Sequence, residues 1–365
     1  MRHFLSTIDW SRAELEDLLK VAAELKVEPI RNSLAGQSIA LLFLNPSMRT
    51  RTSFDLGMQQ LGGIAIVLQP GKDAWGVEFE PGVVMDGDAE EHIAEVAGVL
   101  SRYCDLIGIR AFPKFQDWSA DREDRVIKTL AKHASVPVIN METIVHPCQE
   151  MALMMTLKER LGDVRKRKFL LTWTWHPRPL NTAVANSALL IASKFGMDVT
   201  MLCPEEAYRL DPQFEDAATR FADEQGGSFE ITHDIEEAYR GAEVVYAKSW
   251  GALPYYGRPD EEWELRKKYR HFIVDEEKMA LTNDGVFSHC LPLRRNGGAM
   301  PRIASAAADT PIAACYLPVP AAGPGAAEIE AFAYIYPKLP IPVLAYCRSG
   351  ARALATYQRA FPGDA

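Results

Sequence analysis

Short apolar runs alternate with amphipathic stretches along most of the chain. An early helix is predicted to begin after Ser11, because Ser11 and Glu14 form a capping-box pattern, and to end near residue 25. A first series of strands is predicted at 38–44, 64–68, 105–110 and 136–140. The helices between these strands are predicted at 50–61, 90–103 and 121–133.

A long helix predicted at about 149–161 leads to a second series of the same kind. Its strands are predicted at 168–173, 198–203, 228–232, 243–248 and 286–289. Its helices are predicted at 181–195, 212–225, 235–240 and 275–281. Repeated strand–helix alternation implies parallel sheets covered on both faces. We therefore predict an α/β fold of two doubly wound parallel-sheet domains, with the active site in the cleft between them.

The pattern changes near residue 297. Residues 297–325 are rich in Gly, Ala and Pro, which is typical of a loop or linker, and a final strand and helix are predicted within about 341–361. The predicted domains are therefore 1–148 and 149–297, followed by an atypical C-terminal tail at 298–365.

The composition narrows the possible partners. A net charge of −9 and a pI of about 5.5 argue against nucleic acid or an anionic membrane surface as the main partner. No stretch approaches the ~18 apolar residues that span a bilayer. The N-terminus lacks the apolar core of a signal peptide, and the six cysteines include no CxxC pair. These features predict a cytoplasmic protein with reduced thiols and no metal site.

The segment Asn45-Pro46-Ser47-Met48-Arg49-Thr50-Arg51 lies where a predicted strand gives way to a helix. Unpaired backbone N–H groups and the positive end of the helix dipole meet two arginines there, which suits a phosphate group. A capped helix with solvated arginines explains the same residues equally well.

Charged or polar residues also follow five other predicted strands. They are Arg110, His146-Pro147-Cys148-Gln149, the segment 176–182, the segment 248–251 and the segment 289–295. Each alone is explained as a solvated strand end or a helix cap, as for Asn181 at the start of a helix. Together they place functional groups at the carboxyl edge of parallel sheets, where ligands bind.

In this order and spacing, the segments 47–51, 146–149 and 289–292, with Arg110, resemble the transcarbamoylase family. Four further segments resemble its acetylornithine branch: 71–75, 172–177, 179–186 and 248–251. An ornithine enzyme would be expected to show a D-x-W-x-S-M-G loop at the last of these. The resemblance spans about residues 1–296.

The resemblance implies transfer of the carbamoyl group of carbamoyl phosphate to the side-chain amine of N2-acetyl-L-ornithine, in arginine biosynthesis. It implies a homotrimer that uses no cofactor or metal, with the carbamoyl phosphate-binding domain at 1–148 and the acetylornithine-binding domain at 149–297. The implied carbamoyl phosphate ligands are Ser47, Met48, Arg49, Thr50, Trp75, Arg110, His146, Gln149, Cys290 and Leu291. Of these, the implied catalytic residues are Thr50, Arg110, His146 and Gln149.

The implied acetylornithine ligands are Glu142, Asn181, Lys248, Leu291 and Arg294. Trp75 would reach into the site of a neighbouring subunit, and Glu90 would lie near the acyl group of the acceptor.

Past Asn296 the resemblance ends. The residues at 297–299 stand where the acetylornithine branch usually has a lysine, and the family's closing arginine helix is not found. The tail around Cys347 instead resembles a fragment of rhodanese-like sulfurtransferases and thiol phosphatases, in which a helix N-terminus and arginines stabilise a thiolate. Three alternatives stay open: a non-catalytic carbamoyl phosphate-binding relative, an ornithine carbamoyltransferase, and a sulfur-transfer or phosphatase role for the tail.

Overall fold

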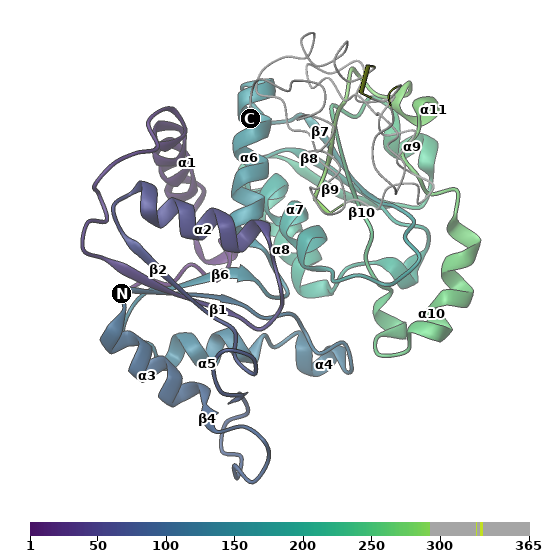
Figure 1. The fold of residues 1–365 in the computed structure, drawn as a ribbon. Helices are drawn as coiled ribbons and strands as arrows, with labels where there is room; N and C mark the ends of the chain where they lie inside the picture. The colour runs from purple at the N-terminus through teal and green to yellow at the C-terminus, as the bar shows by residue number, and fades with distance from the viewer. Residues whose placement is uncertain (293–325, 327–328, 331–365) are drawn as a thin grey trace. The chain divides into compact units, whose positions relative to one another are not determined.

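The computed structural model describes residues 1–292, 326, 329 and 330, and Figure 1 draws the other residues in grey. Residues Met1–Ile273 and Leu281–Cys290 form one compact unit, which contains both large sheets. A second unit comprises Val274–Ala280 and Leu291–Ala365. The domain boundaries read from the sequence stay a prediction. The predicted rhodanese-like tail and the strand and helix within 341–361 lie outside the described residues.

The first sheet has four parallel strands in the order β2-β1-β5-β6. They are β1 (Ser38–Phe43), β2 (Ile64–Leu68), β5 (Leu106–Arg110) and β6 (Val138–Glu142). The helix α2 (Arg49–Gln60) covers one face, and α3 (Ile93–Tyr103) and α5 (Arg125–His133) cover the other, as Figure 1 shows. The short helix α4 (Trp118–Asp121) precedes α5.

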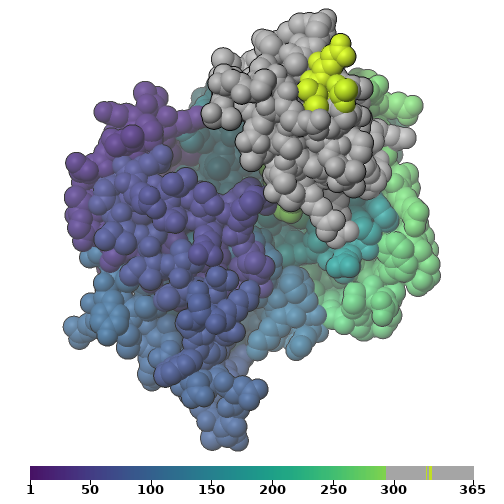
Figure 2. Space-filling view, viewed as in Figure 1, coloured from purple at the N-terminus to yellow at the C-terminus, as the bar shows by residue number. Residues whose placement is uncertain are grey.

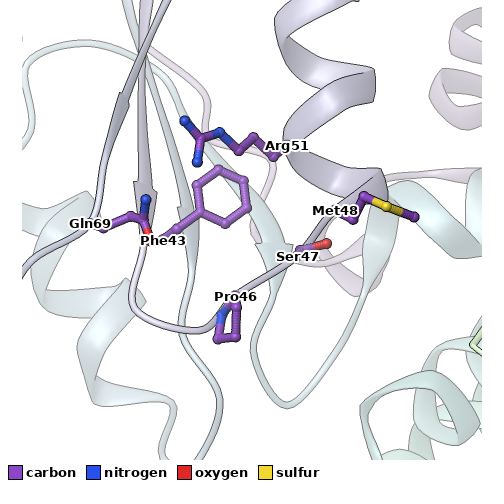
Figure 3. A pocket seen from close by; sticks show the side chains of 6 residues that line it. All are labelled: Phe43, Pro46, Ser47, Met48, Arg51 and Gln69. Atoms are coloured by element: carbon purple, nitrogen blue, oxygen red, sulfur yellow. The ribbon is translucent and has the colours of Figure 1, made fainter. Parts of the chain in front are cut away.

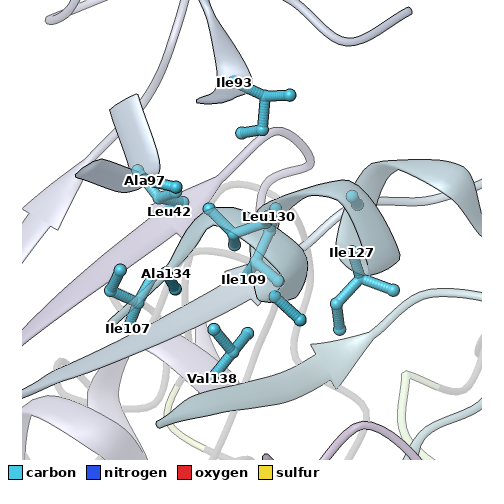
Figure 4. Close-up of a cluster of buried hydrophobic side chains, with 11 residues drawn as sticks. Leu42, Ile93, Ala97, Ile107, Ile109, Ile127, Leu130, Ala134 and Val138 are labelled. Carbon is cyan, nitrogen blue, oxygen red and sulfur yellow. The ribbon is translucent and has the colours of Figure 1, made fainter. Parts of the chain in front are cut away.

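Alternating side chains of β1 pack on opposite faces of this sheet. Leu42 joins Ile107, Ile109 and residues of α3 and α5 in one core cluster (Figure 4). Leu41 and its odd-numbered neighbours pack with Met58 of α2 in the other. A strand that is apolar on both faces is the expected result of helices on both sides of a parallel sheet.

The second sheet has five parallel strands in the order β11-β10-β7-β8-β9. They are β7 (Lys168–Trp173), β8 (Asp198–Leu202), β9 (Ser228–Thr232), β10 (Val244–Lys248) and β11 (Val286–His289). Its helices are α6 (Pro147–Leu161), α7 (Ala183–Lys194), α8 (Pro212–Gln225), α9 (Ile235–Tyr239) and α10 (Pro259–Arg266). Every residue of α7 is buried, which explains its run of small and aliphatic side chains. The helix α11 (Glu276–Met279) belongs to the second compact unit.

The nine strands and the main helices read from the sequence are confirmed, with shifted ends. The predicted helix at 121–133 is divided into α4 and α5, because Asp124 adopts a left-handed conformation with φ of 51°. The predicted helix at 90–103 begins only at Ile93, because Glu91–His92 forms a short strand, β4, beside β3 (Val77–Glu78). None of the described helices is both long and apolar enough to cross a membrane.

The first ten residues connect the two sheets. Phe4 pairs with the edge strand β6: its N–H donates to Val138 O at 2.8 Å, and its carbonyl accepts from Asn140 N at 2.9 Å. Farther along, the ammonium group of Lys194, at the end of α7, donates to the carbonyls of Thr7, Ile8 and Trp10 at 2.7, 3.1 and 2.6 Å. We call residues 4–10 the N-terminal strap. The helix α1 (Arg12–Val27) follows it, with the predicted capping box of Ser11 and Glu14.

Candidate active site

The loop after β1 brings the predicted phosphate residues to the start of α2. Arg49 is the first residue of the helix, and Ser47 Oγ accepts the N–H of Thr50 at 3.2 Å. The side chains of Met48 and Arg49 are exposed. This helix start therefore offers N–H groups and a positive dipole end to an anion from outside.

A pocket with a volume of about 230 Å³ opens at the same loop (Figure 3). It is lined by Phe43, Pro46, Ser47, Met48, Arg51 and Gln69. Figure 3 shows Arg51 and Phe43 among the side chains that line this pocket. The sequence motif contained Arg51 without a role for it, and Gln69 was missed because nothing in sequence joins it to residues 46–51.

Three charged or titratable side chains meet at the carboxyl ends of β5 and β6. The Arg110 guanidinium forms an ion pair with the Glu142 carboxylate, and His146 Nε2 lies 3.6 Å from the same carboxylate oxygen. All three residues are at most 9% exposed. Arg110 Nε and His146 Nδ1 are buried and have no hydrogen-bond partner among the described residues. Buried polar atoms are normally hydrogen-bonded, so these two unpaired atoms mark the cluster as a candidate binding site.

A break in strand register aims Glu142 at Arg110. The pairing of β5 with β6 shifts between Ile109 and Arg110, so that Met141 is the extra residue of a bulge. Glu142 follows with a positive φ of 150°, and its N–H donates to Asn140 Oδ1 at 2.9 Å. Bulges beside an active site commonly redirect a side chain in this way.

A network of buried hydrogen bonds stabilises this bulge. Asn140 Nδ2 donates to Thr143 Oγ1 at 2.9 Å and to Leu5 O at 2.9 Å. Thr143 Oγ1 donates in turn to Asp124 Oδ2 at 2.7 Å. Burial raises the pKa of Asp124 to about 6. The sequence analysis missed this network, because its members are ordinary polar residues until the fold brings them together.

The charges around Glu142 set the protonation of the cluster. Burial raises the pKa of Glu142, while Arg110, then Lys248 and Arg49, act in the opposite direction. Burial, with a smaller contribution from Arg110, lowers the pKa of His146 to about 3. His146 is therefore a neutral imidazole at physiological pH. The positive charges of Arg49 and Lys248 therefore favour the ionised form of Glu142, though less than Arg110 does.

The first turn of α6 joins the cluster to the second sheet. The N–H of His146 donates to Ser187 Oγ of α7 at 2.7 Å, and Gln149 Nε2 donates to Tyr246 OH of β10 at 3.3 Å. Burial raises the pKa of Cys148 to about 12. Cys148 therefore stays a neutral thiol at physiological pH, and a neutral thiol is a poor nucleophile.

The second sheet contributes its predicted residues at the ends of β7, β10 and β11. Lys248 is buried at the end of β10. Asn181 lies in the loop after β7, where Oδ1 accepts from Ala183 N at 3.1 Å and Nδ2 donates to Thr143 O at 2.9 Å. Asn181 thus caps the first turn of α7 and contacts the residue after Glu142. Cys290 follows His289, whose pKa burial lowers to about 4.

Other predicted residues are not brought to this cluster. Trp75 is 68% exposed, and Glu90 is exposed where the chain enters β4, at the base of a loop that projects outward in Figures 1 and 2. Leu291 belongs to the second compact unit and is 57% exposed. Arg294 lies outside the described residues. Within the described residues, no group of three or more His, Cys, Asp or Glu side chains is arranged to hold a metal ion.

Comparison with known proteins identifies the family. Residues 2–159 match the model of the aspartate/ornithine carbamoyltransferase carbamoyl-P binding domain, and residues 171–316 match that of the Asp/Orn binding domain. An N-acetylornithine carbamoyltransferase from Xanthomonas campestris is 65% identical over 298 residues, which are 81% of this chain and 88% of that protein. An N-succinylornithine carbamoyltransferase from Bacteroides thetaiotaomicron is 35% identical over 286 residues, 78% of this chain and 85% of that one.

A solved structure agrees with these relatives. The crystal structure of acetylornithine transcarbamylase complexed with acetylcitrulline has a TM-score of 0.82 and 63% sequence identity to this chain, and the match covers 85% of this chain and 92% of that one. The two parallel sheets, the order of the motifs and the two matched domain models therefore all indicate the same family. The chain belongs to the aspartate/ornithine carbamoyltransferase family, with its two parallel-sheet α/β domains.

Proposed function

We propose that this protein transfers the carbamoyl group of carbamoyl phosphate to the side-chain amine of N2-acetyl-L-ornithine, giving N-acetyl-L-citrulline and phosphate in arginine biosynthesis. The observation that carries the proposal is the buried cluster of Arg110, Glu142 and His146 at the carboxyl edge of the first sheet, together with a helix start suited to phosphate. The 65% identity to a protein named N-acetylornithine carbamoyltransferase supports the choice of acceptor.

Carbamoyl phosphate would bind to the first sheet. The start of α2, with Ser47, Met48, Arg49 and Thr50, takes the phosphate. Arg110 and the neutral His146 would donate hydrogen bonds to the carbonyl oxygen, and Gln149 would bind the amide NH2. Thr50 adds a third donor. Such donors are aimed where negative charge develops, and each is worth roughly 3–4 kcal/mol in the transition state.

The acceptor must attack as a neutral amine. A primary amine with a pKa near 10.4 is mostly protonated at pH 7, and removing the proton costs roughly 4–5 kcal/mol. The positive charges of Arg110 and Lys248 would disfavour the ammonium form of the acceptor. The departing phosphate would take the amine's proton. Acceptor contacts are proposed for Glu142, Asn181, Lys248, Leu291 and Arg294, which would hold the amine close to its target.

The assembly and location are part of the proposal. A homotrimer in which Trp75 reaches the site of a neighbouring subunit, as a further carbamoyl phosphate contact beside Cys290 and Leu291, fits the 68% exposure of its side chain. A cytoplasmic location fits the free thiols of the described cysteines. We expect neither nucleic acid nor membrane as a partner, because the net charge is −9.

A carbamoyl-transfer assay on the full chain tests the proposal. Carbamoyl phosphate is supplied with N2-acetyl-, N2-succinyl- or unblocked ornithine, and the ureido product is measured. We expect product from acetylornithine and none from ornithine. The control is Arg102→Met, an exposed arginine on α3, which should be as active as the wild type.

Substantial turnover of ornithine would contradict the assigned acceptor. Preference for succinylornithine would contradict the acetyl assignment alone. Calorimetric binding of carbamoyl phosphate without turnover of any acceptor would replace the proposal with a non-catalytic role.

A further inference from the structure

Arg266, the last residue of α10, is a completely buried arginine outside the residues assigned above. Its side chain is 0% exposed, and that of its partner Glu262, one helical turn earlier, is 2% exposed. Guanidinium groups are almost never fully buried unless they are paired, so the surroundings of Arg266 must satisfy it.

Arg266 uses all five of its N–H donors. Nε and one N–H of NH2 donate to the carboxylate of Glu262. The other N–H of NH2 donates to Trp250 O at 2.7 Å. NH1 donates to Ser249 Oγ at 3.1 Å and to His176 O at 3.2 Å.

The acceptors other than Glu262 lie in two loops at the carboxyl edge of the second sheet. Ser249 and Trp250 directly follow Lys248, and His176 begins the loop that leads to Asn181. The loops also bond to each other directly, since Gly251 N donates to Leu180 O at 2.9 Å. Arg266 therefore lies at the junction between the segments that present Lys248 and Asn181.

Aromatic rings enclose this junction. The guanidinium carbon of Arg266 lies 5.0 Å from the ring centroid of Trp173 and 5.5 Å from that of Tyr208. Trp173 Nε1 donates to Trp250 O at 3.0 Å, and Trp250 Nε1 donates to Tyr208 O at 2.7 Å. Trp173 and Trp250 are at most 1% exposed, so water has little access to replace a lost bond. A shorter or uncharged side chain at 266 would leave loop carbonyls unpaired.

We propose that Arg266, held in place by Glu262, is a positioning residue for the acceptor: it fixes the loop of Lys248 against the loop of Asn181 and thereby sets acceptor affinity. This inference rests on the proposed function, in which Lys248 and Asn181 contact acetylornithine. Most of the proposed carbamoyl phosphate residues lie at the ends of β1 and β5 or at the starts of α2 and α6, and none of the five bonds of Arg266 goes to any proposed carbamoyl phosphate residue.

The chain offers a matched control at the opposite edge of the same two strands. Arg167 precedes β7 and donates to Glu243, which precedes β10, at 2.6 Å. Its other bonds go to the carbonyls of Asp163 and Leu161 at 2.9 and 3.1 Å. This pair has a similar chemical make-up, but it lies at the amino edge, away from Lys248 and Asn181.

The test compares Arg266→Lys with Arg167→Lys in the full-length protein. For Arg266→Lys we expect the KM for acetylornithine to rise roughly ten- to a hundredfold, because a single ammonium cannot reach all the acceptors, while the KM for carbamoyl phosphate changes by less than about twofold. Hydrogen exchange at Gly251 N, bonded to Leu180, should accelerate. Arg167→Lys should leave both KM values unchanged and protect Gly251 as in the wild type.

Two milder variants keep the test decisive if Arg266→Lys does not fold. Ser249→Ala removes one acceptor and should raise the KM for acetylornithine by about two- to fivefold, and Glu262→Gln should raise it further because it leaves the guanidinium without a counter-charge. Equal effects on both substrates, or unchanged KM values with a lower melting temperature, would overturn the proposal. Failure of the wild type to use acetylornithine would instead refute the proposed function, and exchange at Gly251 would still decide whether Arg266 orders the loops.

Discussion

The carboxyl edges of the two sheets hold their polar side chains in different ways. At the first sheet, Arg110 and Glu142 form an ion pair, and the neutral ring of His146 lies beside the same carboxylate. At the second, Lys248 ends β10 just before one loop and Asn181 lies in another, and Arg266 donates to backbone carbonyls of both loops. The first arrangement responds when a ligand brings charge, because ion pairs in a small cluster depend on every neighbour. The second is set before the ligand arrives, since its bonds involve no atom that the ligand would contact.

Mutation of the charged cluster at the carboxyl edge of the first sheet should have the largest effect on activity. Arg110→Met removes the proposed donor to the carbonyl oxygen and leaves the buried carboxyl group of Glu142 without its paired cation. We expect kcat to fall by about 10²–10³-fold at saturating substrates, with Arg102→Met as the control. A kcat within about threefold of the wild type would show that the charged cluster is not the catalytic half of the site.

Mutation at the carboxyl edge of the second sheet should lower the affinity for acetylornithine. Lys248→Met should raise the KM for acetylornithine about ten- to a hundredfold, because a hydrogen bond to a charged group contributes roughly 1.5–3 kcal/mol. Carbamoyl phosphate affinity, measured by calorimetry, should stay within about twofold. Adding Arg266→Lys to Lys248→Met should raise the KM for acetylornithine by a smaller factor than Arg266→Lys does alone, since both changes act on one loop. Full additivity would separate Arg266 from the action of Lys248.

The two edges share one response to pH, through His146 and His289. Their pKa values are lowered, mainly by burial, to about 3 and about 4. An unfolded histidine takes up a proton near pH 6.5, so stability should fall as the pH drops from about 6.5 toward these values, by up to about 1.4 kcal/mol per pH unit for each residue. When the unfolding free energy is measured by urea denaturation between pH 4.5 and 7, it should depend less steeply on pH in His146→Gln and in His289→Gln than in the wild type. An unchanged slope would mean that the ring is protonated in the folded protein.

The smallest effect is expected from the network below Glu142. The pKa of Asp124 is raised to about 6, so the folded protein keeps a proton there that the unfolded chain loses above about 3.8, and stability falls as the pH rises from about 3.8 to 6. Asp124→Asn removes that cost, keeps an acceptor for Thr143 and suits the left-handed φ of 51°. We expect a gain of about 1 kcal/mol in unfolding free energy at pH 7, and a loss of about 1–3 kcal/mol for Asp124→Ala. A loss in the Asn variant would show that the carboxylate is charged in the folded state.

The features that depend on hydrophobic periodicity and on the order of strands and helices could mostly be predicted from the sequence. Arg110 and His146 end apolar strands or begin helices, so their place at a sheet edge follows from the alternation alone. Glu142 was assigned a role only through family resemblance. Its ion pair with Arg110 depends on a bulge at Met141 that no sequence period marks, and the predicted strand stopped at residue 140.

The helix α10 shows more clearly what could not be predicted from the sequence. Its sequence PDEEWELR contains mostly charged residues, and such a segment normally indicates a solvated surface. The structure buries Glu262 and Arg266 completely because each satisfies the other and the loop carbonyls complete the set. Burial of charge depends on partners from distant parts of the chain, here as far as His176, and single-sequence patterns carry no such information. The roles of Trp75 and Arg294 stay predictions.

The N-terminal strap has a consequence for how the protein is made. The carbonyls of residues 7–10 emerge from the ribosome 184 to 187 residues ahead of the ammonium group that binds them. At synthesis rates of about 5–20 residues per second, the nascent chain must wait roughly 10–40 s for that partner. During this interval the N-terminal strap is available to chaperones or proteases, because the side chain that later binds it has not yet been made.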